Sequence, residues 1–237
     1  MAEQLYFRQL LSGRDFAIGD QMAAQMANFS YLIGDRETRQ GVIVDPAYDI
    51  AGLLDVAAGD DMAIVGALAT HYHADHVGGS FMGHAVEGVR ELLAAVSVPI
   101  HVQRDEAELV RRQAGLSASD LVSHDGGEVI EVGAVTVQVV HTPGHTPGSQ
   151  CFLVDGRLVA GDTLFLEGCG RTDLPGSDPA AMYESLHRLT SLPDEVVVYP
   201  GHHYSAASLG TLGAVKESNY VLAPRTREQW LAMFGGQ

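Results

Sequence analysis

Cysteine and basic residues are both scarce in this sequence. Cys151 and Cys169 are the only cysteines among 237 residues, and their spacing is not C-x-x-C. No disulfide framework of the kind that stabilises small secreted domains is therefore expected. Lysine and arginine together number 14 against 30 aspartates and glutamates, which gives a formal net charge of −16. Proteins that coat nucleic acids or anionic membranes need a basic field, so we expect neither kind of partner.

The sequence also lacks long apolar runs and an N-terminal pattern typical of a secretory signal peptide. No stretch of about 18 consecutive apolar residues predicts a membrane-spanning helix. The first residues, "MAEQLYFRQLLSGRD", lack the zones of a secretory signal. We therefore expect a cytoplasmic protein. The sequence also has no short repeat and no long linker, which predicts a single domain over residues 1–237 with a short helical C-terminal segment at about 206–237.

Short runs rich in valine, isoleucine and leucine predict strands. They lie at residues 29–34, 41–45, 62–69, 98–102, 128–140, 150–154, 157–160 and 195–199. In the run at 128–140, Val129, Val135, Val137 and Val139 alternate with polar residues. The following "QCFLVDGRLVAGD" predicts a hairpin that turns at Asp155-Gly156. The later half therefore favours an antiparallel sheet.

Helical patterns lie between these strands. "PAYDIAGLLDVAAG" at 46–59 has an apolar face and ends at Gly59, and "SDPAAMYESLHRLTSLP" has Asp178 as its N-cap and Pro179 in its first turn. Two further helices flanking a strand are expected in 81–115, where they either cover part of a pocket or only pack. Near the C-terminus, "TREQWLAMF" predicts a last helix that packs Trp230 and Phe234. Two sheets with helices on their outer faces would accommodate all these elements in an α/β fold.

Metal-binding side chains are concentrated where an apolar strand ends. The stretch "THYHADHVGG" at 70–79 has three histidines and an aspartate within six positions. Three later motifs, "HTPGHTPGS", "AGDTLF" and "YPGHHYS", also follow apolar runs. Loops at strand ends are held by a rigid scaffold and often carry function. The candidate ligands at these four strand ends are His71, His73, Asp75, His76, His145, Asp162 and His202.

The spacing predicts two adjacent metal sites. Positions i and i+2 of an extended segment point to the same side, so His71 and His73 can bind one ion, while Asp75 and His76 lie past the bend and face a second. We expect His145 to complete the first site, His202 to complete the second, and Asp162 to bridge the two. Imidazole and carboxylate ligands suit two divalent ions, zinc first, with iron or manganese as alternatives.

Two such ions imply a hydrolytic chemistry. A water between two metal ions has a lowered pKa, which makes a metal-bridging hydroxide available at neutral pH as a nucleophile. We expect Asp75 to act as the catalytic residue that orients this hydroxide and handles its proton. The other histidines are expected outside the site: His84, His101, His124 and His187 as surface or packed residues, and His141 and His203 in outer or surface positions.

The motifs "HYHADH", "HTPGHTPGS", "GDTLF" and "YPGHHY" together resemble those of the metallo-β-lactamase superfamily, in particular its glyoxalase II (hydroxyacylglutathione hydrolase) and persulfide dioxygenase branches. The resemblance runs from about residue 28 to residue 205. It implies an αββα four-layer sandwich with metals at one edge of the two mixed sheets. It also implies the same division of the seven ligands, with His71, His73 and His145 on one ion, Asp75, His76 and His202 on the other, and Asp162 between them.

The segment "LEGCGRTDLPGSDP" bears on the choice of branch. Glyoxalase II enzymes have a Cys-Gly-Lys type sequence at the matching place, where the lysine holds the thiol. Here Cys169 precedes Arg171, whose guanidinium can bind a carboxylate by two hydrogen bonds. The sequence "GCGRTD" resembles persulfide dioxygenases more closely, while related "GRTD" sequences also occur in short bacterial glyoxalase II forms. Tyr204 matches a tyrosine that contacts glutathione in glyoxalase II. The resemblance thus implies that Cys169, Arg171 and Tyr204 bind substrate, while the short C-terminal region leaves open whether glutathione or another low-molecular-weight thiol is used.

The leading functional hypothesis is a hydrolase for the thioester of an S-acylated thiol such as S-lactoylglutathione. The alternative is a persulfide dioxygenase with a single Fe(II) held by His71, His145 and Asp162, a two-histidine, one-carboxylate set. Persulfide dioxygenases resemble this sequence in keeping the other histidines and the aspartate as well, so the number of candidate ligands does not discriminate between the two functions. A nuclease-like member is disfavoured by the acidic charge, an inactive interaction domain by the complete ligand set, and a β-lactamase by the expected cytoplasmic location.

Overall fold

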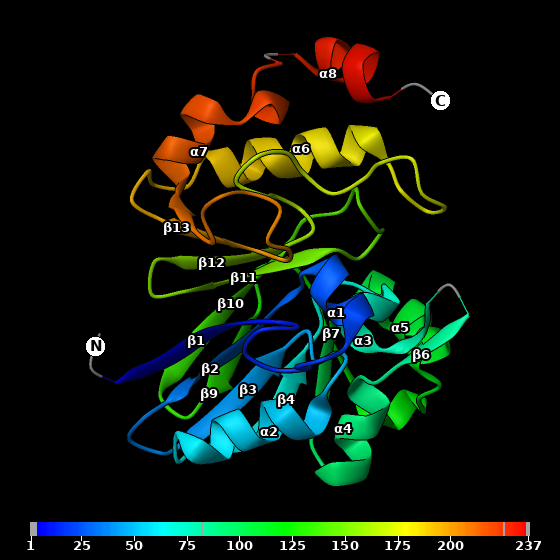
Figure 1. Ribbon diagram of the computed structural model, residues 1–237. Helices are drawn as coiled ribbons and strands as arrows, with labels where there is room; N and C mark the ends of the chain where they lie inside the picture. Colours follow the sequence, from blue (N-terminus) through cyan, green and yellow to red (C-terminus); the bar gives the residue numbers. More distant parts are fainter. Residues whose placement is uncertain (1–3, 82, 225, 236–237) are drawn as a thin grey trace.

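The computed structural model describes residues 4–81, 83–224 and 226–235. Two six-stranded sheets lie face to face, and helices cover the outer face of each (Figure 1). The four layers confirm the expected αββα sandwich. That residues 1–237 form a single domain stays a prediction.

The first sheet has the strand order β1-β2-β3-β4-β7-β8. The β1-β2-β3 part is antiparallel, and β3, β4, β7 and β8 run parallel to one another. A small hairpin of β5 and β6 stands apart from both sheets. The strand bounds are β1 Leu5–Leu11, β2 Phe29–Asp35, β3 Gln40–Val44, β4 Ala63–Leu68, β5 Gly79–Phe81, β6 His84–Val86, β7 Ile100–Gln103 and β8 Leu121–His124.

The second sheet has the order β14-β13-β12-β11-β10-β9. It is antiparallel except for β12 and β13, which run parallel because α6 crosses over between them. The hairpin predicted at Asp155-Gly156 is confirmed, with φ values of 45° and 74° that suit a tight two-residue turn. The strand bounds are β9 Val129–Val132, β10 Val135–His141, β11 Gln150–Val154, β12 Arg157–Gly161, β13 Val197–Pro200 and β14 Gly210–Thr211.

Helices fill the connections. The expected ends of two of them are confirmed: α2 ends at Gly59, and α6 begins with Pro179 after Asp178, whose side chain accepts hydrogen bonds from two amides of the first turn. The two helices and the strand expected in 81–115 are α4, β7 and α5. The helix bounds are α1 Gln21–Met26, α2 Ile50–Gly59, α3 Ala74–Val77, α4 Val89–Ala95, α5 Ala107–Ala114, α6 Pro179–Thr190, α7 Leu212–Ser218 and α8 Arg227–Phe234, with 3₁₀ turns η1 Arg104–Glu106, η2 Ala118–Asp120 and η3 Tyr220–Leu222.

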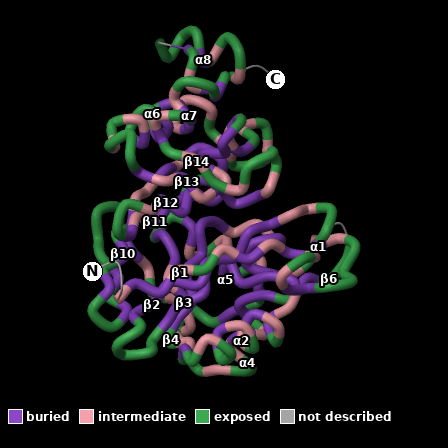
Figure 2. The backbone as a smooth tube through the Cα atoms, turned by 60° about the vertical axis from the view of Figure 1, so that its left-hand side comes forward, coloured by how far each residue is buried: buried purple, intermediate pink, exposed green. Residues whose placement is uncertain are grey.

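The hydrophobic core has three clusters of buried side chains, one for each contact between layers. Figure 2 marks in purple the buried residues, which concentrate along the strands of the two sheets. Leu53 of α2 and Leu92 of α4 pack under the first sheet. Ile33 of β2 and Phe152 of β11 belong to the cluster between the two sheets. Trp230 of α8 is fully buried with the cluster over the second sheet. The cluster between the sheets takes residues from β1 to β4 of the first sheet and from β9 to β12 of the second, so a close-packed core supports the edge that they share.

The C-terminal helix packs as expected. The Trp230 indole donates to the carbonyl oxygen of Pro179 over 2.7 Å, and its ring lies 4.2 Å from that of Phe234. Helix α8 thus covers the first turn of α6. Among the described helices, none has the length and apolar character needed to span a bilayer.

The run at 128–140 is not one strand. It folds into the hairpin of β9 and β10, because Gly133 takes a left-handed φ of 61° and Val132 pairs with Val135. This two-residue turn shifts the alternation by one position. Ile130 and Val132 are therefore buried before the turn, and Val129, which we expected to share a face with the later valines, is 49% exposed. The strands β1, β5, β6, β8 and β14 and the helices α1 and α3 were not predicted, while α7 lies in the C-terminal segment that was expected to be helical.

Candidate metal centre

The seven predicted ligands come together at one edge of the sandwich. His71 follows β4, His145 follows β10, Asp162 directly follows β12, and His202 follows β13. The α3 turn, which begins just after His73, presents Asp75 and His76 from the same loop as His71. The four strand ends therefore meet as the sequence indicated.

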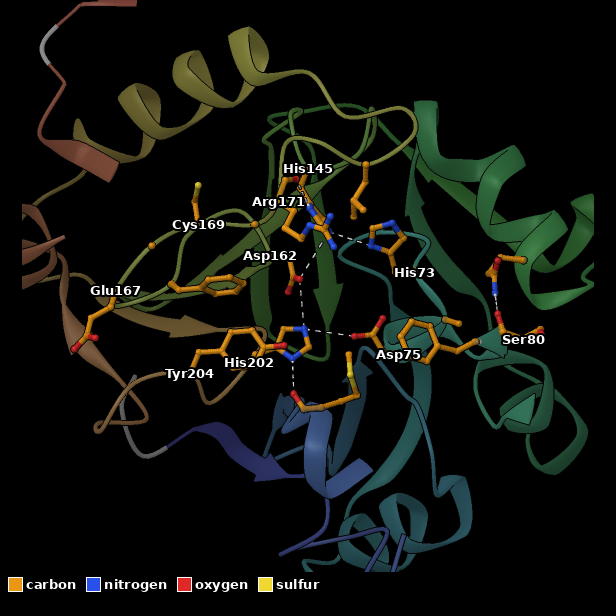
Figure 3. Close-up of a pocket in the computed structure, with 18 of the residues that line it drawn as sticks. His73, Asp75, Ser80, His145, Asp162, Glu167, Cys169, Arg171, His202 and Tyr204 are labelled. Atoms are coloured by element: carbon orange, nitrogen blue, oxygen red, sulfur yellow. Dashed lines mark hydrogen bonds and ion pairs between the residues drawn. The ribbon is translucent and has the colours of Figure 1, made fainter. Parts of the chain in front are cut away.

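Three imidazoles form the first group. The Nδ1 atom of His73 lies 3.0 Å from the Nε2 atom of His71. It also lies 3.0 Å from the Nε2 atom of His145, toward which the His73 ring points (Figure 3). His71 and His145 are almost completely buried. The i, i+2 spacing led us to expect that His71 and His73 share one ion, with His145 as the third ligand. The three nitrogens are close enough together to bind a common ion.

Asp75, His76 and His202 form the second group. The Nε2 atoms of His76 and His202 are 3.3 Å apart. The Oδ2 atom of Asp75 lies 3.4 Å from the His202 nitrogen and 3.5 Å from that of His76. The side chains of all three residues are buried, so a cation placed among them would be shielded from bulk water.

Asp162 lies between the two groups. Its Oδ2 atom is 3.3 Å from the Nε2 atom of His202 and 3.7 Å from that of His145, and its Oδ1 atom is 3.5 Å from that of His76. Oδ1 is buried and has no hydrogen-bond partner among the described residues. A buried carboxylate oxygen without a partner is costly in a protein, and a metal ion at this position would satisfy it.

The outer ring nitrogens of these histidines have their own partners. The Nδ1 atom of His145 donates to the carbonyl oxygen of Arg171 over 2.8 Å, and that of His202 donates to the carbonyl oxygen of Met26 over 2.8 Å. In the neutral form of each ring, these bonds place the proton on Nδ1 and leave Nε2 directed at the centre. Metal-binding histidines in proteins are fixed in this way. The donor set therefore fits a divalent metal ion.

Asp45 is a functional residue that our sequence analysis missed. Its Oδ2 atom accepts a hydrogen bond from Nδ1 of His76 at 2.8 Å, and its two oxygens also accept from the amide and hydroxyl of Thr70, each at 2.7 Å. It follows the apolar run "GVIV", which is the same signal that identified Asp162. Asp45 therefore orients one candidate ligand and anchors the residue before His71.

Asn28 was missed too. Its amide donates to Oδ2 of Asp75 over 3.1 Å, and its carbonyl oxygen accepts from the hydroxyl of Tyr48 over 3.1 Å. A local pattern could not identify it, because the three residues come from distant segments. Asn28 fixes the orientation of the predicted catalytic carboxylate.

The charges of the site favour a cation at its centre. Burial lowers the pKa of His71 well below its usual range and that of His73 to about 4. Both rings are therefore neutral, as metal ligands must be. Burial also disfavours the charged form of His76, but Asp75 and Asp162 outweigh burial and raise its pKa to about 10. The carboxylates thus favour a positive charge here, which a divalent ion would supply in place of the proton.

A cavity of about 670 Å³ opens over both groups and includes the three predicted substrate residues in its lining. The Cys169 thiol has a pKa raised to about 12 by burial, so it is not a thiolate at neutral pH. The Arg171 guanidinium makes two hydrogen bonds, each 2.8 Å long, to Asp173. The Tyr204 ring stacks on that of His202 with centroids 4.6 Å apart. Phe81 also lines the cavity, so the 81–115 segment contributes to its wall.

The remaining histidines lie outside these metal groups, as expected. His141 donates to the carbonyl oxygen of Pro147, and His203 packs on the ring of Phe29. His84 is exposed on β6, and His187 contacts the ring of Tyr183.

His101 and His124 form a separate chain at the edge of the first sheet. A hydrogen bond of 2.7 Å joins His101 Nδ1 and His124 Nε2, and the Nδ1 atom of His124 lies 2.9 Å from Oε2 of Glu128. The chain connects β7 and β8 of the first sheet to the segment that leads into β9 of the second.

This chain predicts a loss of stability in mild acid. Burial, followed by the neighbouring His124, lowers the pKa of His101 from 6.5 to about 4. Between these values the unfolded chain binds a proton that the folded chain does not, so the free energy of unfolding falls as the pH falls. For His101 we expect a fall of about 1–2 kcal/mol between about pH 7 and pH 5, measured by urea unfolding in the presence of a chelator. His101→Gln should reduce this pH dependence, and an unchanged dependence would contradict the assignment.

Comparisons with known proteins agree with this geometry. A family model described as the metallo-beta-lactamase superfamily matches residues 25–202. The hydroxyacylglutathione hydrolase of Alkalilimnicola ehrlichii is 35% identical over 210 residues, which cover 89% of this chain and 75% of the relative. The mitochondrial persulfide dioxygenase ETHE1 of Homo sapiens is 30% identical over 218 residues, which cover 90% of this chain and 77% of the relative.

A solved structure has the same architecture. The crystal structure of ETHE1 from Myxococcus xanthus matches with a TM-score of 0.79 and 30% identity, covering 98% of this chain and 90% of that chain. The family match includes all seven predicted ligands, from His71 to His202. By sequence, fold and the convergence of these side chains, the chain belongs to the metallo-beta-lactamase superfamily.

Proposed function

We propose that the protein is a metal-dependent hydrolase that cleaves the thioester of an S-acylated low-molecular-weight thiol, of the S-lactoylglutathione type. The observation that carries this proposal is the pair of three-residue groups with Asp162 between them. A relative named hydroxyacylglutathione hydrolase, 35% identical, supports it. In the proposed site, His71, His73 and His145 hold one divalent ion, Asp75, His76 and His202 hold the other, and Asp162 contacts both.

The proposed ions are zinc first, with iron or manganese as alternatives, because imidazole and carboxylate ligands suit all three. When bound, such ions lower the pKa of water and polarise a carbonyl group. The protein must therefore supply orientation and proton transfer rather than a strong base of its own.

Asp75 is the proposed proton acceptor. Its carboxylate lines the cavity, and the Asn28 amide holds it on the side that faces His202. In the proposed reaction a water adds to the thioester carbonyl and gives a proton to Asp75. The carbon–sulfur bond then breaks, and the leaving sulfur takes the proton from Asp75 to become a thiol. The acyl group leaves as a carboxylic acid, which releases its remaining proton to solvent and becomes a carboxylate. The orientation of Asp75 by Asn28 is what makes this transfer specific.

The thiol part of the substrate is proposed to lie along Cys169, Arg171 and Tyr204. All three line the cavity, and Tyr204 presents a ring that is 53% exposed beside His202. The bond between Arg171 and Asp173 holds the guanidinium on one side of the cavity. A carboxylate of glutathione, or of another small thiol, would have to share Arg171 with Asp173.

A second function has specific support. The Homo sapiens relative is named persulfide dioxygenase, and the ETHE1 structure from Myxococcus xanthus covers nearly the whole chain. The alternative is a dioxygenase that holds a single Fe(II) through His71, His145 and Asp162 and acts on a thiol persulfide. The three iron ligands of the dioxygenase are among the seven ligands proposed for the hydrolase. The two functions therefore differ in the number and kind of metal ions bound and in the need for O₂.

Metal analysis combined with two assays tests the proposal. Protein purified without added metal should contain two divalent ions per chain and should hydrolyse S-lactoylglutathione or another acyl thioester. O₂ consumption with a thiol persulfide should be absent. One iron per chain with persulfide-dependent O₂ uptake and no thioester hydrolysis would replace the hydrolase with the dioxygenase.

A further inference from the structure

Glu106 is a buried charged residue that the proposed reaction does not use. It ends the 3₁₀ turn η1 and is 1% exposed. Buried carboxylates in proteins persist where donors satisfy them, so the partners of Glu106 indicate what it does.

The carboxylate of Glu106 joins the two loops that carry the first histidine group. Its Oε1 atom accepts from the backbone amide of Tyr72 at 2.8 Å and from the hydroxyl of Thr146 at 2.7 Å. Its Oε2 atom accepts from the backbone amide of Gly148 at 2.7 Å. Tyr72 lies between His71 and His73 in the sequence, and Thr146 directly follows His145. One side chain therefore holds both ligand-bearing loops.

Gln150 also joins the two loops, but at their bases. Gln150 donates from its backbone amide to the carbonyl oxygen of Thr70 and from its side chain to that of Ala69. Glu106 acts further along, next to the histidines themselves. The glycine at position 148 permits this contact, because a Cβ atom there would lie 2.5 Å from the backbone nitrogen of Glu106.

We propose that Glu106 is a positioning residue: it sets the distance between the His71–His73 loop and the His145 loop, and so sets the affinity of this histidine group for its divalent ion. The nitrogens that must converge are 3.0 Å apart across the two loops, between His73 and His145. A displacement of either loop by a fraction of an ångström changes the ligand geometry on which metal affinity depends. The inference rests on the proposed metal site.

The test measures metal binding rather than activity alone. Glu106→Gln keeps the size of the side chain but replaces one accepting oxygen with a donating amide, which opposes one of the three donors. We expect the dissociation constants for Zn²⁺ and Co²⁺, measured by competition with a chelator, to rise about 10–100-fold at the first group. The visible absorption of the Co²⁺ protein should also change, because it reports ligand geometry.

Asp35→Asn is a matched control. The Asp35 carboxylate is fully buried and also accepts from two backbone amides, of Glu37 and Ala134, and from one threonine hydroxyl, of Thr38. It lies at the end of β2, away from the predicted ligands. Both variants should lower the melting temperature of the metal-free protein, but Asp35→Asn should leave the metal dissociation constants and the Co²⁺ spectrum unchanged.

The outcomes separate two kinds of failure. If Glu106→Gln binds both ions with dissociation constants within about twofold of the wild-type values and gives the same Co²⁺ spectrum, the positioning role is overturned. The proposed function is then left intact. A wild-type protein that binds neither ion would overturn both. If Glu106→Gln does not fold, Thr146→Val removes one of the three donors and should raise the dissociation constants by a smaller factor, about 3–10-fold. Unchanged constants in that variant would equally overturn the role.

Discussion

Replacing Asp162 with alanine is expected to remove metal from both groups and to lower kcat/KM for the thioester by about 10³-fold or more. Its Oδ2 atom lies within 3.7 Å of nitrogens of both His145 and His202, and its Oδ1 atom has no other described partner. The variant leaves the imidazoles of both groups without the anion placed between them. Metal content should fall from about two ions per chain to well below one, measured by atomic emission on dialysed protein.

Asp55→Ala is a suitable control for Asp162→Ala. Asp55 is an exposed aspartate in the middle of α2, so its replacement also removes one negative charge but leaves the strand ends untouched. It should keep the wild-type metal content and activity. Full metal content in Asp162→Ala would remove Asp162 from its bridging role.

The second large effect is expected for Asp75→Asn, which keeps the shape of the side chain but not its charge or basicity. We expect kcat to fall about 10²–10⁴-fold, because the amide cannot accept the proton of the attacking water. The metal of the second group should be weakened, since Asp75 lies 3.4–3.5 Å from the nitrogens of His202 and His76. The first group, His71, His73 and His145, should retain its ion.

Asp75→Asn also discriminates between the two functions. For a single Fe(II) held by His71, His145 and Asp162, this substitution should leave the iron content unchanged. A stoichiometric loss of one of two ions supports the two-metal hydrolase, and an unchanged single iron with O₂ uptake supports the dioxygenase. Near-wild-type hydrolysis by Asp75→Asn would contradict the proton-acceptor role.

The close grouping of the predicted ligands could be foreseen because their signals are local. Alternation along an extended chain places His71 and His73 on the same side, and strand ends that meet at one edge bring His145 and His202 towards them. The helix limits at Gly59 and Asp178 also follow from residues next to them in the sequence. Each of these predictions needs only a few neighbouring positions.

The supporting residues could not be found in this way. Asn28, Asp45 and Glu106 act through partners 20 to 47 positions away in the sequence, and only the folded sheets bring these partners within hydrogen-bond distance. The misread strand at 128–140 has a different cause. Apolar and polar residues alternate on both sides of the two-residue turn at Gly133-Ala134, so the sequence looks like one strand. The turn nevertheless moves the buried residues from even-numbered positions before it to odd-numbered positions after it.

Each three-residue group takes ligands from both sheets. In the first group, His71 and His73 follow a strand of the first sheet, and His145 follows a strand of the second sheet. In the second group, Asp75 and His76 come from the first sheet, and His202 comes from the second. A bound ion is therefore a cross-link between the two halves of the sandwich. By mass action, free metal at about 1,000 times its dissociation constant would stabilise the assembled state by about 4 kcal/mol per site. Metal supply would then govern how long the folded chain persists as well as whether it reacts.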